Sequence, residues 1–414
     1  MTTPSADLAW GLTALAFVTF MLCGIALYYA GIAGRKNPLN MIMMVIGSLA
    51  VTAVLYVAFV HGLVLGDSVL GLGLIGNPLQ FLGMESARTN TESGGPEDAW
   101  TFAFYLMFAA ITVAIVSSGA LGRMKFGAWL VFSGLWLVLV YAPVAHWVFA
   151  FDDEETGTVG GWLRNVVGLH DFAGGTAVHM NAGMAALALA LVLGKRKDTS
   201  ERPHNLPLVV LGGSMLFLGW FGFNGGSGGG ATFTSQYAIL TTILAACTGT
   251  LGYLLVEKKR TGRMTTFGLI TGLIGGLVGI TPCADAVSPL GALLVGLVAG
   301  ALVSWAVTWK SKWGIDESLD AFAVHGVGGI AGTICVIFVG AASAPAGVTG
   351  IFFGGDPSII WRELVAIVAT CGYSFLVTAA LAWFMKRTMG LRVEEQVEER
   401  GLDQSLHAES AYDR

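Results

Sequence analysis

The chain has 414 residues, of which 55% are hydrophobic and only 12% are charged. An ordinary soluble domain carries about 25% charged residues, so this composition excludes a soluble enzyme or binding module and indicates a protein that crosses a membrane repeatedly. The net charge of −5 is modest and the basic residues lie between apolar segments, which gives no support to nucleic-acid binding.

Segments close to the roughly 20 apolar residues needed to cross a bilayer recur along almost the whole chain. We predict an all-α polytopic membrane protein with about eleven transmembrane helices. The expected spans are 8–31, 41–63, 99–121, 127–149, 162–193, 207–223, 237–256, 265–281, 289–309, 320–340 and 361–385. We expect a transmembrane domain over 1–385 and a cytoplasmic C-terminal tail over 386–414.

The basic residues predict the orientation, because cytoplasmic loops carry an excess of lysine and arginine. Of the 22 basic residues, only Arg88, Arg164 and Arg362 fall in the even-numbered loops. With an odd number of spans, the N-terminus is expected outside the cell and the C-terminus in the cytoplasm. The expected location is the plasma membrane, which is the inner membrane of the cell. The first span lacks a basic segment before it and a cleavage site after it, so we expect a retained helix.

The third span carries an aromatic cluster toward its outer end, formed by Phe102, Phe104, Tyr105 and Phe108. One interpretation is packing against lipid or the protein core. The other is the lining of a path for a cation, because an aromatic face stabilises a partly desolvated cation by roughly 2 kcal/mol. The spacing of the residues does not separate the two interpretations.

The fifth predicted span contains an acid and a histidine within a glycine-rich apolar stretch, 171–183. Ionisable residues in a membrane span are costly and usually face a partner or a pathway. If the stretch is helical, Asp171 and His179 lie about 12 Å apart along the axis, one near the end of the span and one near its middle. This spacing suggests a pore, although a buried histidine with only a packing role is the simpler alternative.

The sixth span ends in a glycine-rich run, 222–230, that follows Trp220 and includes Phe223 and Ser227. The run lacks the Gly-Lys-Ser/Thr ending of a phosphate-binding loop. A broken helix end that lines a cavity is the better interpretation, because irregular backbone at that depth is tolerated only there. The Ser227 hydroxyl can then accept a hydrogen bond from a guest.

The tenth span repeats the pattern of the fifth, with Asp320, His325 and clustered glycines in 320–329. Two such stretches in two halves indicate an internal repeat, and many transporters place their site at the interface of inverted repeats. After the last span, the polar residues 390–412 form a tail that composition alone would leave disordered.

Together these residues resemble the ammonium transporters of the Amt/Mep/Rh superfamily, on the bacterial Amt side. The resemblance runs through 104–108, 143–146, 171–179, 220–227, 320–329 and 390–412, which is nearly the whole chain. It implies a homotrimer with one pore per subunit. Each subunit would consist of two inverted five-helix repeats plus an eleventh helix.

The resemblance also implies roles for individual residues. Those implied to bind substrate in the outer vestibule are Phe108, Phe149, Trp220 and Ser227. The implied gate is the stacked pair Phe108 and Phe223, and the implied pore histidines are His179 and His325. Asp171 and Asp320 would have structural roles at the site. Two positions depart from the family pattern, with Phe149 in place of a cage tryptophan and Gly122 in place of a frequent glutamate.

The implied function is ammonium capture at the outer vestibule, deprotonation, and conduction of ammonia, with or without a separate proton. An ammonium sensor with little net transport is the alternative, and the lack of an added signalling domain counts against it. An intact gate and histidine pair argue against a carrier of a different small solute. The expected partners are ammonium or ammonia, the lipid bilayer and a PII-type regulatory protein on the cytoplasmic face. We expect no enzymatic reaction, no cofactor and no metal.

Overall fold

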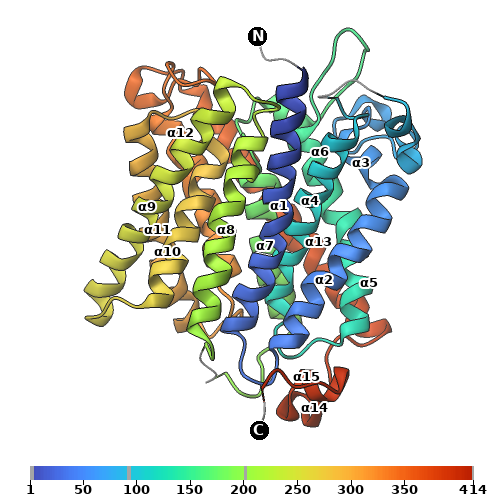
Figure 1. Ribbon diagram of the computed structural model, residues 1–414, viewed down its shortest axis with the longest axis vertical. Coiled ribbons are helices and arrows are strands. Elements are labelled where there is room, and N and C mark those ends of the chain that lie inside the picture. The colour runs from blue at the N-terminus through green and yellow to red at the C-terminus, as the bar shows by residue number, and fades with distance from the viewer. Residues whose placement is uncertain (1–3, 91–94, 200–202, 413–414) are drawn as a thin grey trace.

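The computed structural model describes residues 4–90, 95–199 and 203–412, which form a bundle of long helices (Figure 1). Eleven helical spans in this part of the chain are long and apolar enough to cross a membrane. Apart from four isolated bridges, the same residues form no strand. The predicted all-α polytopic fold with eleven transmembrane helices is confirmed.

Each span is one long helix or a helix joined to a short π-helical or 3-10 stretch. In order, the spans are α1 (Pro4–Ile32); α2 (Pro38–Leu55) with Tyr56–Val60 and α3 (His61–Leu65); α4 (Ala99–Val116) with Ser117–Ala120; α5 (Phe126–Trp136) with Leu137–Tyr141 and α6 (Ala142–Phe149); Gly175–Met180 with α7 (Asn181–Leu193); α8 (Leu206–Gly226); α9 (Phe233–Thr261); α10 (Thr266–Ile280) with Thr281–Cys283; α11 (Pro289–Lys312); Phe322–Val327 with α12 (Gly328–Val339); and α13 (Ser358–Thr388). Short helices outside the spans are Val69–Gly71, Leu82–Arg88, Leu163–Val167, Ile351–Phe353, α14 (Glu395–Arg400) and α15 (Leu402–His407).

The fifth span is the one whose predicted start is wrong. It was expected from 162, but its helix begins at Gly175. Gly168 adopts a left-handed backbone with φ of 80° and ends the short turn over Leu163–Val167. Asp171 therefore precedes the helix, and the expected helical rise of about 12 Å from Asp171 to His179 does not exist. Apolar composition could not locate the first residue of this helix. The loop before the helix is itself largely buried, so it is mostly apolar as well.

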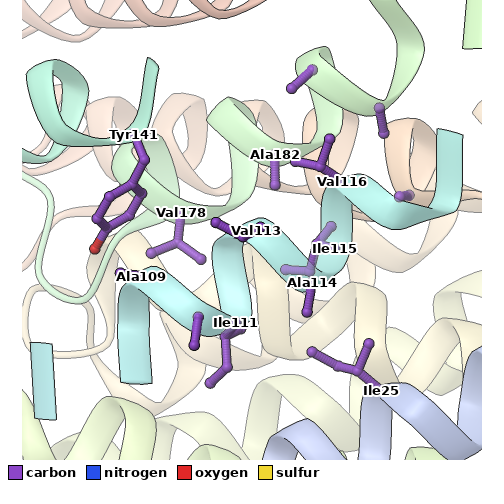
Figure 2. Packing of buried hydrophobic residues seen from close by; sticks show 14 of the residues in the cluster. Ile25, Ala109, Ile111, Val113, Ala114, Ile115, Val116, Tyr141, Val178 and Ala182 are labelled. Carbon is purple, nitrogen blue, oxygen red and sulfur yellow. The ribbon is translucent and has the colours of Figure 1, made fainter. Parts of the chain in front are cut away.

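The centre of the bundle is formed by α4 and the fifth span. Figure 2 shows Ile111 and Ile115 of α4 in the same apolar cluster as Val178 and Ala182 of the fifth span. Both spans are among the most buried of the eleven. Helices that are apolar on all sides belong in such a core, so the polar groups that these two carry stand inside the protein and not against lipid.

The two histidine-bearing helices cross at a pair of glycines. A Cβ atom added to Gly183 would lie 2.3 Å from the backbone nitrogen of Gly326, closer than real Cβ atoms come. Small residues allow this close approach of helix backbones in membranes. The crossing brings the fifth and tenth spans together next to His179 and His325.

The C-terminal tail is ordered and packs against the end of the bundle opposite to the start of α1 (Figure 1). The Asp403 carboxylate accepts hydrogen bonds from the backbone N–H groups of Leu39 and Asn40 at 3.1 and 2.8 Å, at the start of α2. Arg392 donates to the carbonyl of Leu193, at the end of the fifth span. We call this end the tail face and the opposite end the far face. The tail is thus not the disordered segment that composition allowed.

Candidate functional site

Two phenyl rings are stacked inside the bundle. The ring centroids of Phe108 on α4 and Phe223 on α8 lie 4.0 Å apart, and the ring planes differ by only 4°. Both side chains are fully buried. The expected stacked pair is therefore present in the structure, assembled from two helices that are distant in sequence.

A cavity of about 440 Å³ opens beside the ring pair, toward the far face. We call it the vestibule. Its lining residues are Trp100, Thr101, Phe104, Tyr105, Phe108, Phe149, Phe151, Arg164, His170, Phe172, Gly226, Ser227, Gly229, Asp285 and Ala346. The Ser227 hydroxyl donates to the carbonyl of Phe223 at 2.9 Å, so its oxygen keeps lone pairs for a donor in the vestibule. The ring of Phe149 stands 6.1 Å from that of Phe108. Phe108, Phe149 and Ser227 thus share one cavity.

Trp220 lies on the other side of the ring pair from the place we expected. It lines a second, narrower cavity together with His179 and His325, and its ring centroid is 5.3 Å from that of His179. Its indole N–H donates to the Thr281 hydroxyl at 2.9 Å. We therefore correct its expected position beside Ser227: Trp220 and Ser227 lie about one helical turn before and after Phe223, and they line different cavities.

The two histidines meet in the narrow cavity. The Nδ1 atoms of His179 and His325 lie 3.2 Å apart, so one ring donates a hydrogen bond to the other. The His179 Nε2 atom is buried and has no hydrogen-bond partner among the described residues. The cavity measures about 20 Å³, which is space for about one water-sized molecule. This arrangement offers a small guest imidazole nitrogens in largely apolar surroundings.

Asp171 caps the helix that carries His179. Its carboxylate accepts hydrogen bonds from the backbone N–H groups of Gly174, Gly175 and Thr176 at 2.8, 2.8 and 2.7 Å, and from the Thr176 hydroxyl. These donors are among the N–H groups that a helix start leaves without a partner. Asp171 does not line either cavity, in agreement with the structural role expected for it.

The second half of the chain uses a different acid for this task. Glu317, and not Asp320, accepts from the backbone N–H groups of Ala321 and Phe322, at 3.1 and 3.2 Å. Asp320 instead lies 2.6 Å from the Lys310 ammonium group and lines a cavity at the tail face. The expected equivalence of Asp171 and Asp320 is thus corrected. The first capped helix starts near the far face and the second near the tail face, as inverted repeats require.

The charged groups of the vestibule are the residues that sequence reasoning missed. Arg164 donates to the Asp171 carbonyl at 2.8 Å, and its guanidinium carbon lies 4.6 Å from the centroid of the Phe151 ring. His170 and Asp285 form a contact of 2.9 Å in the same wall. The sequence signals for this cluster were a histidine directly before the acid of the 171–183 stretch and Asp285, an acid within the largely apolar stretch 280–287.

Known proteins resemble this chain in sequence over nearly its whole length. The chain matches the model of the Ammonium Transporter Family over residues 9–412. It is 52% identical over 406 residues to an ammonium transporter of Corynebacterium glutamicum, covering 98% of this chain and 89% of that protein. It is 44% identical over 432 residues to an ammonium transporter of Mycobacterium tuberculosis, covering 98% and 90%.

Solved structures resemble it in fold. The structure of Saccharomyces cerevisiae Mep2 has a TM-score of 0.82 and 32% identity, covering 94% of this chain and 88% of Mep2. A structure described as a sensor Amt protein has a TM-score of 0.86 and 27% identity, covering 97% and 98%. With a family match over nearly its whole length and a relative at 52% identity, the chain belongs to the ammonium transporter family.

Proposed function

We propose that this chain takes up ammonium across the plasma membrane, with the vestibule outside the cell and the tail face in the cytoplasm. The observation that carries the proposal is the stacked Phe108–Phe223 pair, which separates a polar-walled vestibule from a narrow cavity lined by the two histidines. The excess of basic residues in the loops of the tail face supports the orientation.

The energetics favour passage of neutral ammonia. A bare cation in a dry apolar passage costs tens of kcal/mol by Born estimates. If the ammonium group of lysine, with a pKa of about 10.4, is taken as an upper limit, deprotonation at pH 7 costs at most about 5 kcal/mol. Deprotonation is therefore the cheaper route through a closed ring stack.

The proposed sequence of events follows the two cavities. Ammonium is held in the vestibule by the aromatic faces of Phe108 and Phe149 and by the Ser227 oxygen. It gives up a proton to water in the vestibule near the ring pair, and ammonia passes His179 and His325 before it takes a proton from water in the cytoplasm. The buried Nε2 atom of His179 supports this scheme, because it can hydrogen-bond the neutral guest.

The direct test is solute uptake and current in proteoliposomes that contain the purified protein. We expect uptake of ammonium and methylammonium and no response to potassium at equal concentration. Liposomes without protein are the control for leakage of ammonia through the bilayer. A response to potassium equal to that for ammonium would contradict the proposal.

A second candidate function is that of an ammonium sensor with little net transport. The similarity in fold to the sensor Amt protein, at a TM-score of 0.86, is the observation that favours it. The same proteoliposomes distinguish the two functions. A sensor would bind ammonium, seen as an increase in thermal stability, without uptake above the protein-free control.

We further propose that three copies assemble into a homotrimer, each with its own pore. Large apolar side chains exposed on α9, α11 and α13, among them Leu255, Leu290 and Val368, support burial of these faces against lipid or neighbouring copies. Size exclusion with light scattering measures the assembly, and a monomer in mild detergent would contradict it.

Phe149→Trp is expected to tighten ammonium capture. Phe149 lines the vestibule beside Phe108, and tryptophan is the stronger cation–π partner. The gain is worth about 1 kcal/mol or less, so the half-saturation concentration should fall by at most about tenfold. The measurement is methylammonium uptake at graded concentrations. An unchanged or higher half-saturation concentration would remove Phe149 from the cation site.

The tail, 386–414, is proposed to help dock a PII-type regulatory protein that plugs the pore from the cytoplasm. Its bonds to the start of α2 and the end of the fifth span hold it on the tail face. Deleting 390–414 should reduce binding of the organism's own PII protein by about tenfold or more, because part of a docking surface is lost.

Pull-down with the full chain and with the deleted chain measures this effect. Asp403→Asn, which weakens the carboxylate bonds to α2 and keeps all residues, is the matched control for loss of order in the tail. Equal binding by the full and deleted chains would remove the tail from the docking surface.

A further inference from the structure

A titratable pair lies in the wall of the vestibule, separate from the ring stack and the pore histidines. His170 Nε2 is 2.9 Å from Asp285 Oδ1, and the two side chains are only 15% and 11% exposed. Both line the same cavity as Ser227 and Phe108. The pair is formed by the loop before the fifth span and the loop after α10, so it exists only in the folded chain.

The groups around His170 come from several elements. Arg164, on the turn Leu163–Val167, lines the vestibule with it. Glu363 of α13 is fully buried and accepts the backbone N–H of His170 at 2.9 Å. The Asp171 carboxylate already accepts hydrogen bonds from the backbone at the start of the fifth span. Tyr105 of α4 lines the same cavity as His170 but carries no charge at neutral pH.

The net charge of the vestibule wall therefore depends on whether the imidazole ring of His170 is protonated. Among the residues that line this cavity, Arg164 and Asp285 carry opposite charges that cancel, and His170 adds one positive charge when it is protonated. Burial opposes that protonation, but the charge of Asp285 and its hydrogen bond outweigh burial and raise the pKa of His170 above its usual value of 6.5. The charged form is thus present below this raised pKa and is lost as the external pH rises through it.

Building on the transport function proposed above, we propose that His170 and Asp285 form a second cation subsite in the vestibule, switched by protonation of His170. With neutral His170, the ring donates its Nε2–H to Asp285, whose carboxylate keeps its charge and attracts ammonium. With protonated His170, the imidazolium cancels that charge and Arg164 makes the wall positive. Ammonium is therefore bound more tightly at alkaline external pH, where His170 is neutral, than at acidic external pH, where His170 is protonated.

The size of the effect follows from Coulomb's law. One added unit charge at the far side of the same cavity, in surroundings between protein and water, changes cation affinity by about threefold to tenfold. Ammonium at Ser227 lies in the cavity that this wall lines, so the change appears in the half-saturation concentration. The pore histidines line the narrow cavity and are not part of this wall.

The test uses methylammonium uptake by the full-length protein in proteoliposomes, at external pH from about 5.5 to 8.5. Methylammonium stays protonated throughout, because alkylammonium groups have a pKa near that of lysine, about 10.4. The half-saturation concentration is compared, because the proton gradient alters the maximal rate. For the unchanged chain, the half-saturation concentration should fall about threefold to tenfold from the lowest to the highest external pH.

Two variants separate the roles of the pair. His170→Gln keeps a donor toward Asp285 and cannot be charged, so its half-saturation concentration should stay at the low, alkaline value at every pH. Asp285→Asn removes the attracting charge and should stay at the high value. His407→Gln, on α15 at the tail face, is the matched control and should follow the unchanged chain.

The outcomes distinguish this inference from the proposed function. If His170→Gln keeps the pH dependence of the unchanged chain, the switch does not exist although transport does. If His170→Gln does not fold, the test rests on Asp285→Asn. A half-saturation concentration that still changes with pH in Asp285→Asn would overturn the inference equally. If the unchanged chain transports neither ammonium nor methylammonium, the proposed function fails, and this inference fails with it.

Discussion

Replacing His179 by aspartate or His325 by glutamate is expected to let potassium through the pore while the chain still folds. The two rings share a hydrogen bond in a cavity of about 20 Å³ with apolar walls. A carboxylate there favours a whole cation, because an opposite charge at about 4 Å is worth about 4 kcal/mol near a protein surface and more when water is excluded. The ratio of ammonium to potassium current should fall by at least about tenfold.

The measurement is ion-replacement current in liposomes, with size-exclusion profiles to verify assembly. His179→Asn and His325→Gln are the matched controls, because they break the ring pair and place no charge in the cavity. These neutral variants should change ammonium conduction without admitting potassium. If the acidic variants keep the selectivity of the unchanged chain, the histidines are packing residues and the proposed passage of ammonia along them is wrong.

Asp171→Asn is expected to destabilise the start of the fifth span and to abolish transport. The carboxylate accepts three backbone N–H groups and one hydroxyl, all buried. An amide has one acceptor oxygen and turns its NH₂ group toward the remaining donors. Each buried donor left without a partner costs about 1 to 3 kcal/mol, so the loss should reach about 3 kcal/mol or more.

Thermal unfolding in detergent measures this loss, with uptake measured on the same preparations. Asp153→Asn is the matched control, because Asp153 also accepts from a backbone N–H and a threonine hydroxyl but stands in an exposed loop. Its cost should stay within about 0.5 kcal/mol. Equal stability of the two variants would mean that the cap at the start of the fifth span contributes little.

The capping acids show where reasoning from sequence succeeded and where it did not. The acid–histidine pattern identified both pore helices, because an ionisable residue in an apolar span is rare enough to stand out. It pointed to Asp171, which caps the helix in the first half, but in the second half the cap is Glu317, and Asp320 pairs with Lys310 instead. Glu317 and Asp320 both precede His325 within one loop, and only the folded backbone decides which carboxylate reaches the free N–H groups.

Trp220 is a second example of this limit. Its place in the sequence, near Phe223 and Ser227, suggested one shared site. Phe223 and Ser227 follow Trp220 by three and seven positions, so all three lie on the same side of the helix. They lie at different depths, because a helix rises about 1.5 Å per residue. The ring stack falls between these depths, so Trp220 belongs to the histidine cavity and Ser227 to the vestibule.

By itself, the sequence determined the number of spans, their approximate limits and the side on which basic residues gather. Each lipid-crossing helix must be long and apolar over its own residues, so this information is local. Only the tertiary structure decided which side chains meet. His179 and His325 are 146 positions apart, and they touch because Gly183 and Gly326 let two helix backbones cross closely. His170 and Asp285 meet in the same way across 115 positions, because packing between distant segments has no signature in the residues of either one.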